Sequence, residues 1–445
     1  MKKCSLGHFF CLRLLLTIQE DNHVMQYTGE GKSVVNRNIR STVMSTRNPV
    51  CELSVGQCME SAMGQTRLRI LIVGAGVAGA TLGALLCARG ERPVLMDRCG
   101  ADDYGGYMLG LFPLGGRVLH SLNAYRKYQE ISSNMARYIY HGRTGKVLNE
   151  FSVADFVGEY GECRGIDRGL LLALLRSEIP KKNIFYNTTI QSLQNKEQGA
   201  LVTFSDGSAQ LFDVVVGADG IHSEIRSLIL SHKEYFYRQT GWGGWIAWRG
   251  LEGFDGETYR EMWSDGWGMG IYPVKDRLGI FMGGNKELVS KYTADTFAKY
   301  IQNNMPKGAL HSALYSLEKT DNSFFWNLED CRTKHWFKHR VILLGDAAAA
   351  FLPTAGIGAS MAMDSAAALA DELSRADVDH LPYAFRLYVK RQRKRVEMAQ
   401  DNSRLLAKVL FCNTPLKSKM RDAVMRFYTI KGLIRNIKRV MEGGR

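Results

Sequence analysis

The sequence predicts an α/β protein with a parallel sheet, an inserted mostly antiparallel sheet and C-terminal helices. Three widely separated apolar runs, at residues 70–73, 214–216 and 341–344, are short and suit strands buried on both faces. Glycine follows each run, and an acidic residue stands close by or at the end of the next strand. A tryptophan-rich stretch at residues 240–285 reads as strands of a separate sheet.

The first segment describes a strand, a glycine turn, a helix and a second strand. The strand at residues 70–73 leads into Gly74-Ala75-Gly76-Val77-Ala78-Gly79, a G-x-G-x-x-G pattern. In such a turn the first glycine permits a tight bend, the second lets a pyrophosphate approach, and the third lets helix and strand pack closely. A helix at residues 78–89 and a strand at residues 93–96 follow, and Asp97 ends that strand with Arg98 beside it. A carboxylate at this distance suits adenosine ribose hydroxyls, so the segment predicts a Rossmann-like dinucleotide site.

Two later segments repeat the combination of strand, glycine and acid. Asp219 follows the second run, and a helix is expected to begin near Ser223. Asp346 follows the third run, directly after Gly345. A glycine-rich loop then precedes the helix expected at residues 359–373, and it contains Pro353, Gly356, Ile357 and Gly358. Ligands of open α/β sheets bind at the carboxyl ends of the strands, so these groups are expected to converge on one ligand.

Two arginines lie near the starts of predicted helices between the first and second segments. Pro113 opens one helix, which carries Arg117 near its start. Asp167 suits the cap of another helix, which begins with Arg168. Arg168 is placed either to reach a phosphate group or to remain solvated, and the local pattern does not decide between these roles.

The stretch at residues 240–285 is predicted to form the wall of a ligand cavity. Alternation along a strand puts Trp242 and Trp248 on one face and Trp245 and Arg249 on the other. Each tryptophan suits either an aromatic sheet core or a cavity for a ring-shaped or lipophilic ligand. Arg249 is either the partner of a ligand carboxylate or a surface arginine. The candidate lining residues are Trp245, Trp248, Arg249 and Tyr272.

The formal net charge of +14 does not indicate a nucleic-acid partner, because most of it lies at one end of the chain. Residues 380–445 hold 17 Lys and Arg against 4 Asp and Glu. Within them, residues 430–441 form an amphipathic basic pattern. This pattern suits a docked helix with a solvated basic face, or weak contact with an anionic membrane surface.

Three further features bound the function. The 9 cysteines form no C-x-x-C pair, which indicates reduced thiols and a cytoplasmic protein. The alternative location is the membrane surface, through contact of the basic C-terminal helix. His335 and His339 are four residues apart but lack a neighbouring carboxylate, so no metal site is predicted. Residues 1–65 are expected to be a poorly ordered extension, or to result from a start codon assigned upstream of a true start at Met63, rather than to form a targeting segment.

The three glycine and acid segments, in this order, resemble the single-component FAD-dependent aromatic monooxygenases, the p-hydroxybenzoate hydroxylase-like family. The resemblance covers about residues 67–398 and implies that the ligand is FAD. The cofactor-binding residues that it implies are Gly74, Ala75, Gly76, Gly79, Asp97, Arg98, Arg117, Arg168, Asp219, Gly345, Asp346, Pro353, Gly356, Ile357 and Gly358. Where the family commonly has Gly-Asp-Ala-Ala-His, this chain ends the string in Ala349, so no polar contact is expected there.

The resemblance also implies a reaction. NADPH or NADH reduces the flavin without a separate nicotinamide domain, and the reduced flavin forms a C4a-hydroperoxide with O2. Its distal oxygen passes to an aromatic or polycyclic, lipophilic small molecule by hydroxylation or epoxidation. No catalytic side chain is implied. The alternatives are a flavin-binding redox regulator without turnover, and a flavin-dependent reductase or halogenase on the same fold.

The predicted domain boundaries follow from the positions of these segments. After the extension at residues 1–65, the first part of the FAD-binding domain spans residues 66–235. The substrate-binding sheet spans residues 236–335, and the FAD-binding domain returns at residues 336–379. Basic C-terminal helices are expected at residues 380–445.

Overall fold

The first sheet contains the parallel strands that the sequence predicts. A computed structural model describes residues 53–103, 106–318 and 324–427. The strand order is β18–β19–β12–β1–β2–β8, and β18 is the antiparallel member. Its strands are β1 Ile70–Val73, β2 Val94–Met96, β8 Ile184–Phe185, β12 Val214–Gly217, β18 Phe337–Lys338 and β19 Val341–Leu343. The register pairs Val73 with Gly217 and Gly217 with Leu343, so all three segments end at one edge of the sheet.

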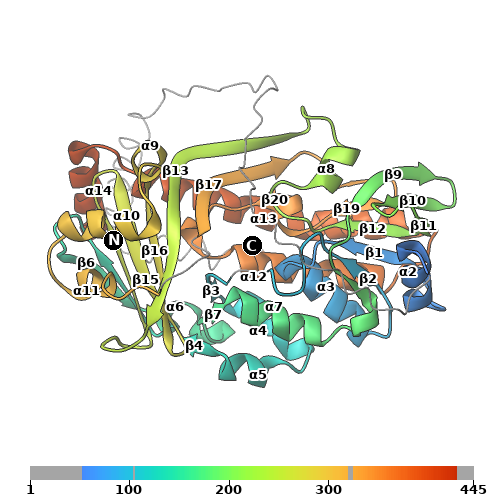
Figure 1. The fold of residues 1–445 in the computed structure, drawn as a ribbon, viewed down its shortest axis with the longest axis horizontal. Coiled ribbons are helices and arrows are strands. Elements are labelled where there is room, and N and C mark those ends of the chain that lie inside the picture. Colours follow the sequence, from blue (N-terminus) through green and yellow to red (C-terminus); the bar gives the residue numbers. More distant parts are fainter. Residues whose placement is uncertain (1–52, 104–105, 319–323, 428–445) are drawn as a thin grey trace, which may run out of the picture. The chain divides into compact units, whose positions relative to one another are not determined.

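Helices pack around this sheet and enclose the main apolar core (Figure 1). They are α3 Val77–Ala88, α4 Pro113–Ser121, α5 Tyr125–Glu130, α7 Arg168–Ser177, α8 Glu224–Ile229, α12 Gly358–Leu373 and α13 Leu381–Leu410. Helix α12 contacts α3, α4 and α13, and α3 also contacts α7. The core forms because β1, β2, β12 and β19 are almost entirely apolar and buried, as expected for strands covered on both faces.

The second large sheet has eight strands in the order β20–β17–β13–β16–β15–β14–β5–β6. Its strands are β5 Arg137–His141, β6 Val147–Ser152, β13 Tyr235–Gly250, β14 Thr258–Trp263, β15 Trp267–Val274, β16 Arg277–Asn285, β17 Phe324–Thr333 and β20 Ala349–Ala350. All pairs are antiparallel except β14 with β5. Strands β5 and β6 come from outside residues 236–335, so this sheet is not a single insertion.

Smaller elements complete the described fold. Two three-stranded sheets contain β3 Met108–Leu111, β7 Arg164–Asp167 and β4 Ser132–Asn134, and β11 Ala209–Phe212, β10 Gly199–Phe204 and β9 Ile190–Lys196. Short helices are α6 Ala154–Val157, α9 Lys286–Val289, α10 Ala294–Asn303 and α11 Ala309–Ala313. The 3-10 turns are η1 Gly158–Tyr160, η2 Lys181–Asn183, η3 Gly345–Ala347 and η4 Pro353–Ala355. Helices α10 and α11 form a second apolar core with β15 and β16.

Helix α2, Val55–Met63, lies within the region that the sequence analysis assigned to an extension. Ser54 and Gln57 form a capping box at its N-terminus, and Met59 and Met63 are buried. The helix contacts β2 and β11, so it belongs to the folded unit, and a chain that began at Met63 would lack it. Residues 1–52 lie outside the described residues.

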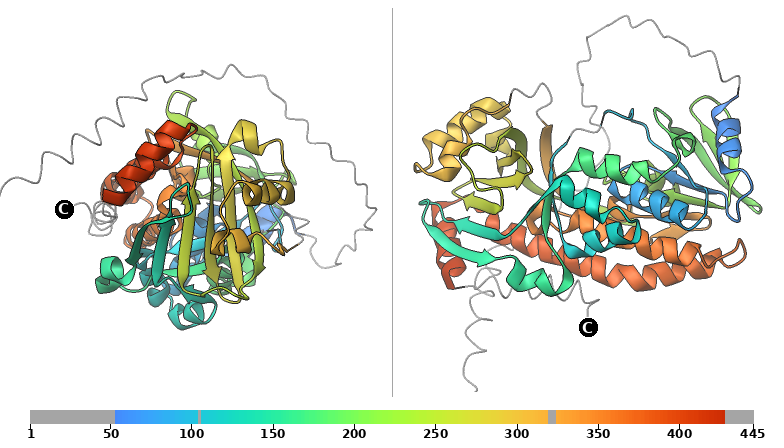
Figure 2. Two further views of the ribbon diagram at one scale, coloured as in Figure 1. Left: turned by 90° about the vertical axis from the view of Figure 1, so that its left-hand side faces the viewer. Right: turned by 90° about the horizontal axis from the view of Figure 1, so that it is seen from below.

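The C-terminal helices connect the two large sheets (Figure 2). Helix α13 contacts α12 and η4 beside the first sheet, and α14, Pro415–Phe427, contacts β6 of the second. No described helix is long and apolar enough to cross a bilayer. The basic pattern at residues 430–441 lies outside the described part of the chain, so its role stays a prediction.

Candidate functional site

The glycine turn after β1 leaves an open space at its second glycine. A Cβ atom on Gly79 would lie 1.9 Å from the Gly74 carbonyl oxygen, so this glycine lets α3 pack against the turn. A Cβ atom on Gly74 would lie 2.4 Å from the carbonyl oxygen of Ala218. By contrast, a Cβ atom on Gly76 would meet no atom within 4 Å beyond its chain neighbours. Gly76 caps α3 and lines a cavity, so the space beside it suits a ligand that approaches the backbone.

Asp97 ties the glycine turn to the end of β2. Its Oδ2 accepts a hydrogen bond from the Ala75 N–H at 2.6 Å, and its Oδ1 accepts one from the Cys99 N–H at 2.9 Å. Asp97 and Arg98 both line the cavity. Each carboxylate oxygen has a second lone pair, so Asp97 can hold the turn and still accept hydrogen bonds from ribose hydroxyls.

Asp219 and Arg226 connect the second segment to its surroundings. Asp219 accepts hydrogen bonds from Ser223 Oγ at 2.6 Å and from the Ile225 N–H at 3.1 Å, at the start of α8. Burial raises the pKa of Asp219, and these hydrogen bonds oppose the rise. Arg226 is fully buried and donates to the Ala347 carbonyl at 3.0 Å. Asp219 lines the cavity, whereas Arg226 joins the second segment to the third behind it.

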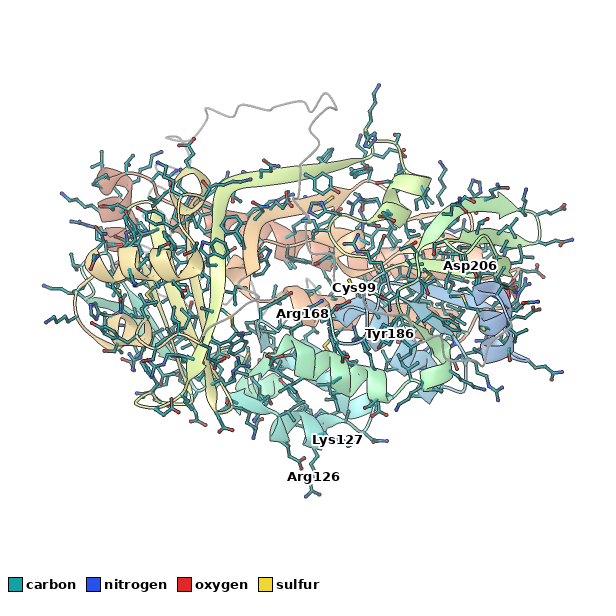
Figure 3. The ribbon with its side chains drawn as sticks, viewed as in Figure 1. Cys99, Arg126, Lys127, Arg168, Tyr186 and Asp206 are labelled. Atoms are coloured by element: carbon teal, nitrogen blue, oxygen red, sulfur yellow. The ribbon has the colours of Figure 1, made fainter. Side chains whose placement is uncertain are left out.

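The third segment places Asp346 in the cavity wall. A Cβ atom on Gly345 would lie 2.7 Å from the Cβ of Ala78 in α3, so glycine allows the third segment to approach the first. Burial raises the pKa of Asp346 to about 6, and the positive charge of Arg168 opposes the rise. Arg168, which is labelled in Figure 3, also lines the cavity. Its guanidinium carbon lies 5.3 Å from the centre of the Tyr107 ring.

The loop before α12 presents the N-terminus of that helix to the cavity. Pro353, Gly356 and Gly358 line the cavity, and Gly356 adopts a φ of +62° that favours glycine. Ile357 is 2% exposed and lies in the core instead. The first N–H groups of a helix lack intrahelical partners and carry the positive end of its dipole. This loop can therefore donate hydrogen bonds to a polar or anionic group in the cavity.

One cavity of about 600 Å³ joins these groups to an aromatic wall, a volume within the range of ligand sites. The aromatic wall is the set of cavity-lining residues from the eight-stranded sheet, namely Tyr138, Tyr140, Phe151, Tyr259, Glu261, Trp263, Tyr272, Phe281, Trp326 and Leu328. At the other end, the open backbone at Gly76 suits a pyrophosphate, and Asp97 and Asp346 suit sugar hydroxyls. The residues present therefore fit a flavin dinucleotide.

Comparisons with known proteins agree with this fit. A family model described as FAD binding domain matches residues 170–380. A flavin-dependent monooxygenase from an unknown prokaryotic organism is 25% identical over 322 residues, which cover 71% of this chain and 82% of the relative. Another flavin-dependent monooxygenase, from Legionella longbeachae, is 26% identical over 332 residues, covering 70% of this chain and 81% of the relative. The predicted resemblance to the FAD-dependent monooxygenases is confirmed, and the chain is a flavin-dependent oxidoreductase.

The fold of this oxidoreductase is also that of a solved flavoprotein. The crystal structure of a variant of HpxO from Klebsiella pneumoniae, in complex with FAD, matches with a TM-score of 0.76 at 18% identity. The match covers 84% of this chain and 99% of HpxO. Another HpxO structure holds FAD and uric acid. The predicted fold class, a Rossmann-like domain with a second sheet and C-terminal helices, is confirmed.

Most of the predicted cofactor residues of the oxidoreductase line the cavity: Gly74, Gly76, Asp97, Arg98, Arg168, Asp219, Asp346, Pro353, Gly356 and Gly358. Four others, Ala75, Gly79, Gly345 and Ile357, do not line it and shape the backbone around it. Arg117 lies elsewhere, because its Nη2 pairs with Asp364 Oδ1 at 2.6 Å. Arg117 thus links α4 to α12, and the structure does not bring it to the cavity.

Of the four predicted substrate-lining residues, Tyr272 lines the cavity and the other three do not. Trp245 packs against the second core with α10 and α11, on the opposite face of the sheet. Trp248 donates its indole N–H to the Gly106 carbonyl at 3.1 Å. Arg249 donates to backbone carbonyls in and after α11, so its guanidinium stabilises that helix rather than facing a substrate.

The C-terminal helices close the aromatic end of the cavity, which the sequence analysis did not predict. Phe411 stacks on Trp242 with ring centres 4.6 Å apart, and Phe411 and Met425 line the cavity. Arg421 is 1% exposed and donates to the Trp263 carbonyl. The local sequence does not predict that Arg421 is buried, because the basic segment around it is typical of a solvent-exposed helix.

Glu261 is a second residue that the sequence analysis missed. It is the only charged side chain among the described lining residues that the eight-stranded sheet supplies. The signal was present, because alternation along β14 puts Tyr259, Glu261 and Trp263 on one face. A carboxylate between two aromatic residues on one face of a strand indicates a lined site rather than a plain core.

Proposed function

We propose that this enzyme uses NADPH or NADH and O2 to insert one oxygen atom into an aromatic or polycyclic, lipophilic small molecule. One reduced nicotinamide, one proton, one O2 and a substrate R–H would give the oxidised nicotinamide, water and R–OH. An alkene would give an epoxide in place of the alcohol. The observation that carries the proposal is the single cavity that contains both the open glycine turn and the aromatic wall.

The residues that would hold FAD follow from the geometry of the cavity. The backbone at Gly76 and the N-terminus of α3 favour the pyrophosphate. Asp97 would accept hydrogen bonds from the adenosine ribose, and Asp346 from hydroxyls of the ribityl chain. The N-terminus of α12 would donate to the polar edge of the flavin ring. FAD, when bound, supplies the electron transfer and oxygen activation, and no side chain needs to act as a nucleophile.

The protein itself contributes orientation and exclusion of water. Rings such as Trp263, Tyr272 and Phe281 form a wall against which a planar substrate packs through its face. Phe411 and Met425 cover this end and limit the access of water to the reacting atoms. The complex of HpxO with uric acid supports a small ring-shaped substrate for this fold.

A cofactor and turnover assay tests the proposal. The purified protein should show flavin absorbance and should oxidise NADPH or NADH slowly when no substrate is present. A member of a panel of phenols and polycyclic compounds should accelerate this oxidation, and mass spectrometry should find a product with one added oxygen atom. A flavin-loaded protein that never yields an oxygenated product across the panel would contradict the proposal.

A further inference from the structure

A carboxylate lies among the rings of the aromatic wall. Glu261 shares one face of β14 with Tyr259 and Trp263, and all three line the cavity. Tyr259 and Trp263 are each 4% exposed, whereas Glu261 is partly exposed. The Glu261 carboxylate is therefore open to the cavity, although aromatic side chains surround it.

Hydrogen bonds from two strands fix this carboxylate. Trp263 Nε1 donates to Oε2 of Glu261 at 2.9 Å, and Tyr272 Oη donates to Oε1 at 2.7 Å. Gly270 pairs with Glu261 across the β14–β15 ladder, and a Cβ atom there would lie 2.1 Å from Tyr272 Oη. Glycine at this position thus makes room for the tyrosine. Burial and the Glu261 carboxylate raise the pKa of Tyr272 well above its ordinary value, so the hydroxyl keeps its proton and remains a donor.

The carboxylate keeps acceptor capacity and has no positive partner. A carboxylate offers about four lone-pair positions. The hydrogen bonds from Trp263 and Tyr272 occupy two of them, and the Tyr138 hydroxyl, which also interacts with Glu261, takes one more, so one position is left for a further donor. No Lys, Arg or His in the described ranges forms an ion pair with Glu261. An unpaired carboxylate among aromatic rings is unfavourable unless a further donor reaches it. Two buried hydroxyls of the wall, on Tyr140 and Tyr259, lack a hydrogen-bond partner within the described residues.

We propose that Glu261 selects the substrate by accepting a hydrogen bond from it, so that the substrate carries a phenolic O–H, a ring N–H or a protonated amine. The inference rests on the proposed function, because it names the class of molecule that the aromatic end of the same cavity accepts. A ring with a carboxylate group is repelled by Glu261. A ring with an ether group leaves the Glu261 oxygens without the additional donor.

Four naphthalene compounds with one shared ring system test this selection. They are 2-naphthol, 2-naphthylmethylamine, 2-methoxynaphthalene and 2-naphthoate, titrated into the FAD-loaded enzyme and followed by calorimetry. The two donors should bind about tenfold or more tightly than 2-methoxynaphthalene, the size expected of a hydrogen bond to a charged group. The anion 2-naphthoate should bind most weakly.

Two variants assign the selection to one carboxylate. Glu261→Gln keeps the size of the side chain and removes its charge, so it should bind 2-naphthoate and 2-methoxynaphthalene alike and lose its preference for the amine. Glu150→Gln on β6 is the matched control, because Glu150 is exposed and lies outside the cavity wall. This control should keep the wild-type order of affinities. Equal thermal unfolding midpoints would show that Glu261→Gln changes recognition rather than folding.

The outcomes separate this inference from the proposed function. If the FAD-loaded wild type binds 2-naphthol no better than 2-methoxynaphthalene, the proposed role of Glu261 is wrong, but the proposed FAD site is not contradicted. The same holds if neither compound binds. The same conclusion follows if Glu261→Gln keeps the wild-type selectivity. A protein that cannot be loaded with FAD, as judged by its absorbance, contradicts the proposed function itself and the inference with it.

Discussion

Replacing Gly76 with alanine separates cofactor binding from folding. A Cβ atom at this position would meet no atom within 4 Å, and the φ of −72° is one that alanine adopts readily. Reduced entropy of the unfolded chain favours the alanine variant by about 0.4–1 kcal/mol. Alanine is a poorer N-cap residue than glycine, with a penalty of up to about 1 kcal/mol. These effects oppose each other, so the unfolding free energy of the apoprotein should change by less than about 1 kcal/mol.

The added methyl group should nevertheless weaken FAD binding. It projects into the space beside Gly76 that the pyrophosphate is expected to occupy, and overpacking of this kind has a penalty of about 1–3 kcal/mol. The dissociation constant for FAD should therefore rise about tenfold or more. Gly79→Ala is the matched comparison, because its Cβ atom would lie 1.9 Å from the Gly74 carbonyl oxygen. That variant should lose about 3 kcal/mol of stability as well as FAD affinity.

Urea unfolding of the apoprotein and FAD titration followed by flavin fluorescence measure the two effects separately. Wild-type FAD affinity in Gly76→Ala would refute the position of the pyrophosphate at this turn. A loss of stability in Gly76→Ala as large as that in Gly79→Ala would refute the open space beside residue 76.

Three other predictions follow from Arg421, from Asp346 and from two cysteines. Arg421→Met should lower the thermal unfolding midpoint by several degrees and leave the FAD content unchanged. The buried carbonyls of Trp263 and Ser264 lose their donor in this variant, at a cost of about 3 kcal/mol. Lys419→Met is the control, because Lys419 is exposed. Burial raises the pKa of Asp346 from 3.8 to about 6, so this carboxyl stabilises the folded apoprotein below about pH 4 and loses that contribution as the pH rises through 6. Asp346→Asn should therefore flatten the pH dependence of the urea midpoint between about pH 4 and 7. Burial raises the pKa of Cys87 and of Cys331 to about 11, so mass spectrometry should find both unmodified by iodoacetamide at about pH 8 until urea is added.

Each of these predictions has a contrary result. Loss of FAD from Arg421→Met would mean that α14 supports the cofactor end as well as the aromatic end. An unaltered pH profile in Asp346→Asn would show that this carboxyl is not desolvated in the folded apoprotein. Rapid alkylation of either thiol in the native protein would contradict its raised pKa.

The cofactor end was predictable because its signals are local. A strand that is followed by Gly74 or that ends in Gly217 marks the edge of a parallel sheet. The register of neighbouring strands then brings Asp97, Asp219 and Asp346 to one cavity. Helix α2 was also readable in principle, since Ser54-x-x-Gln57 is a capping box.

The substrate end was not predictable because its residues depend on distant partners. Arg249 was a candidate for a substrate carboxylate, but it binds carbonyls more than sixty positions away in the sequence. Arg421 looked solvated in its basic segment, yet it is buried beneath the strand that carries Trp263. Alternation along β13 separates the two faces of the strand but does not determine which core each face packs against, so it does not place Trp245.

The source of the oxygen atom in the product tests the central claim most directly. The purified enzyme would be supplied with FAD, NADPH, the substrate found by the panel and oxygen gas labelled with the heavy isotope, in ordinary water. We predict that each product molecule carries one labelled oxygen atom. A product whose added oxygen comes from water, or a flavin-loaded protein that oxidises its substrate without adding oxygen, would contradict the assignment of this cavity to a monooxygenase reaction.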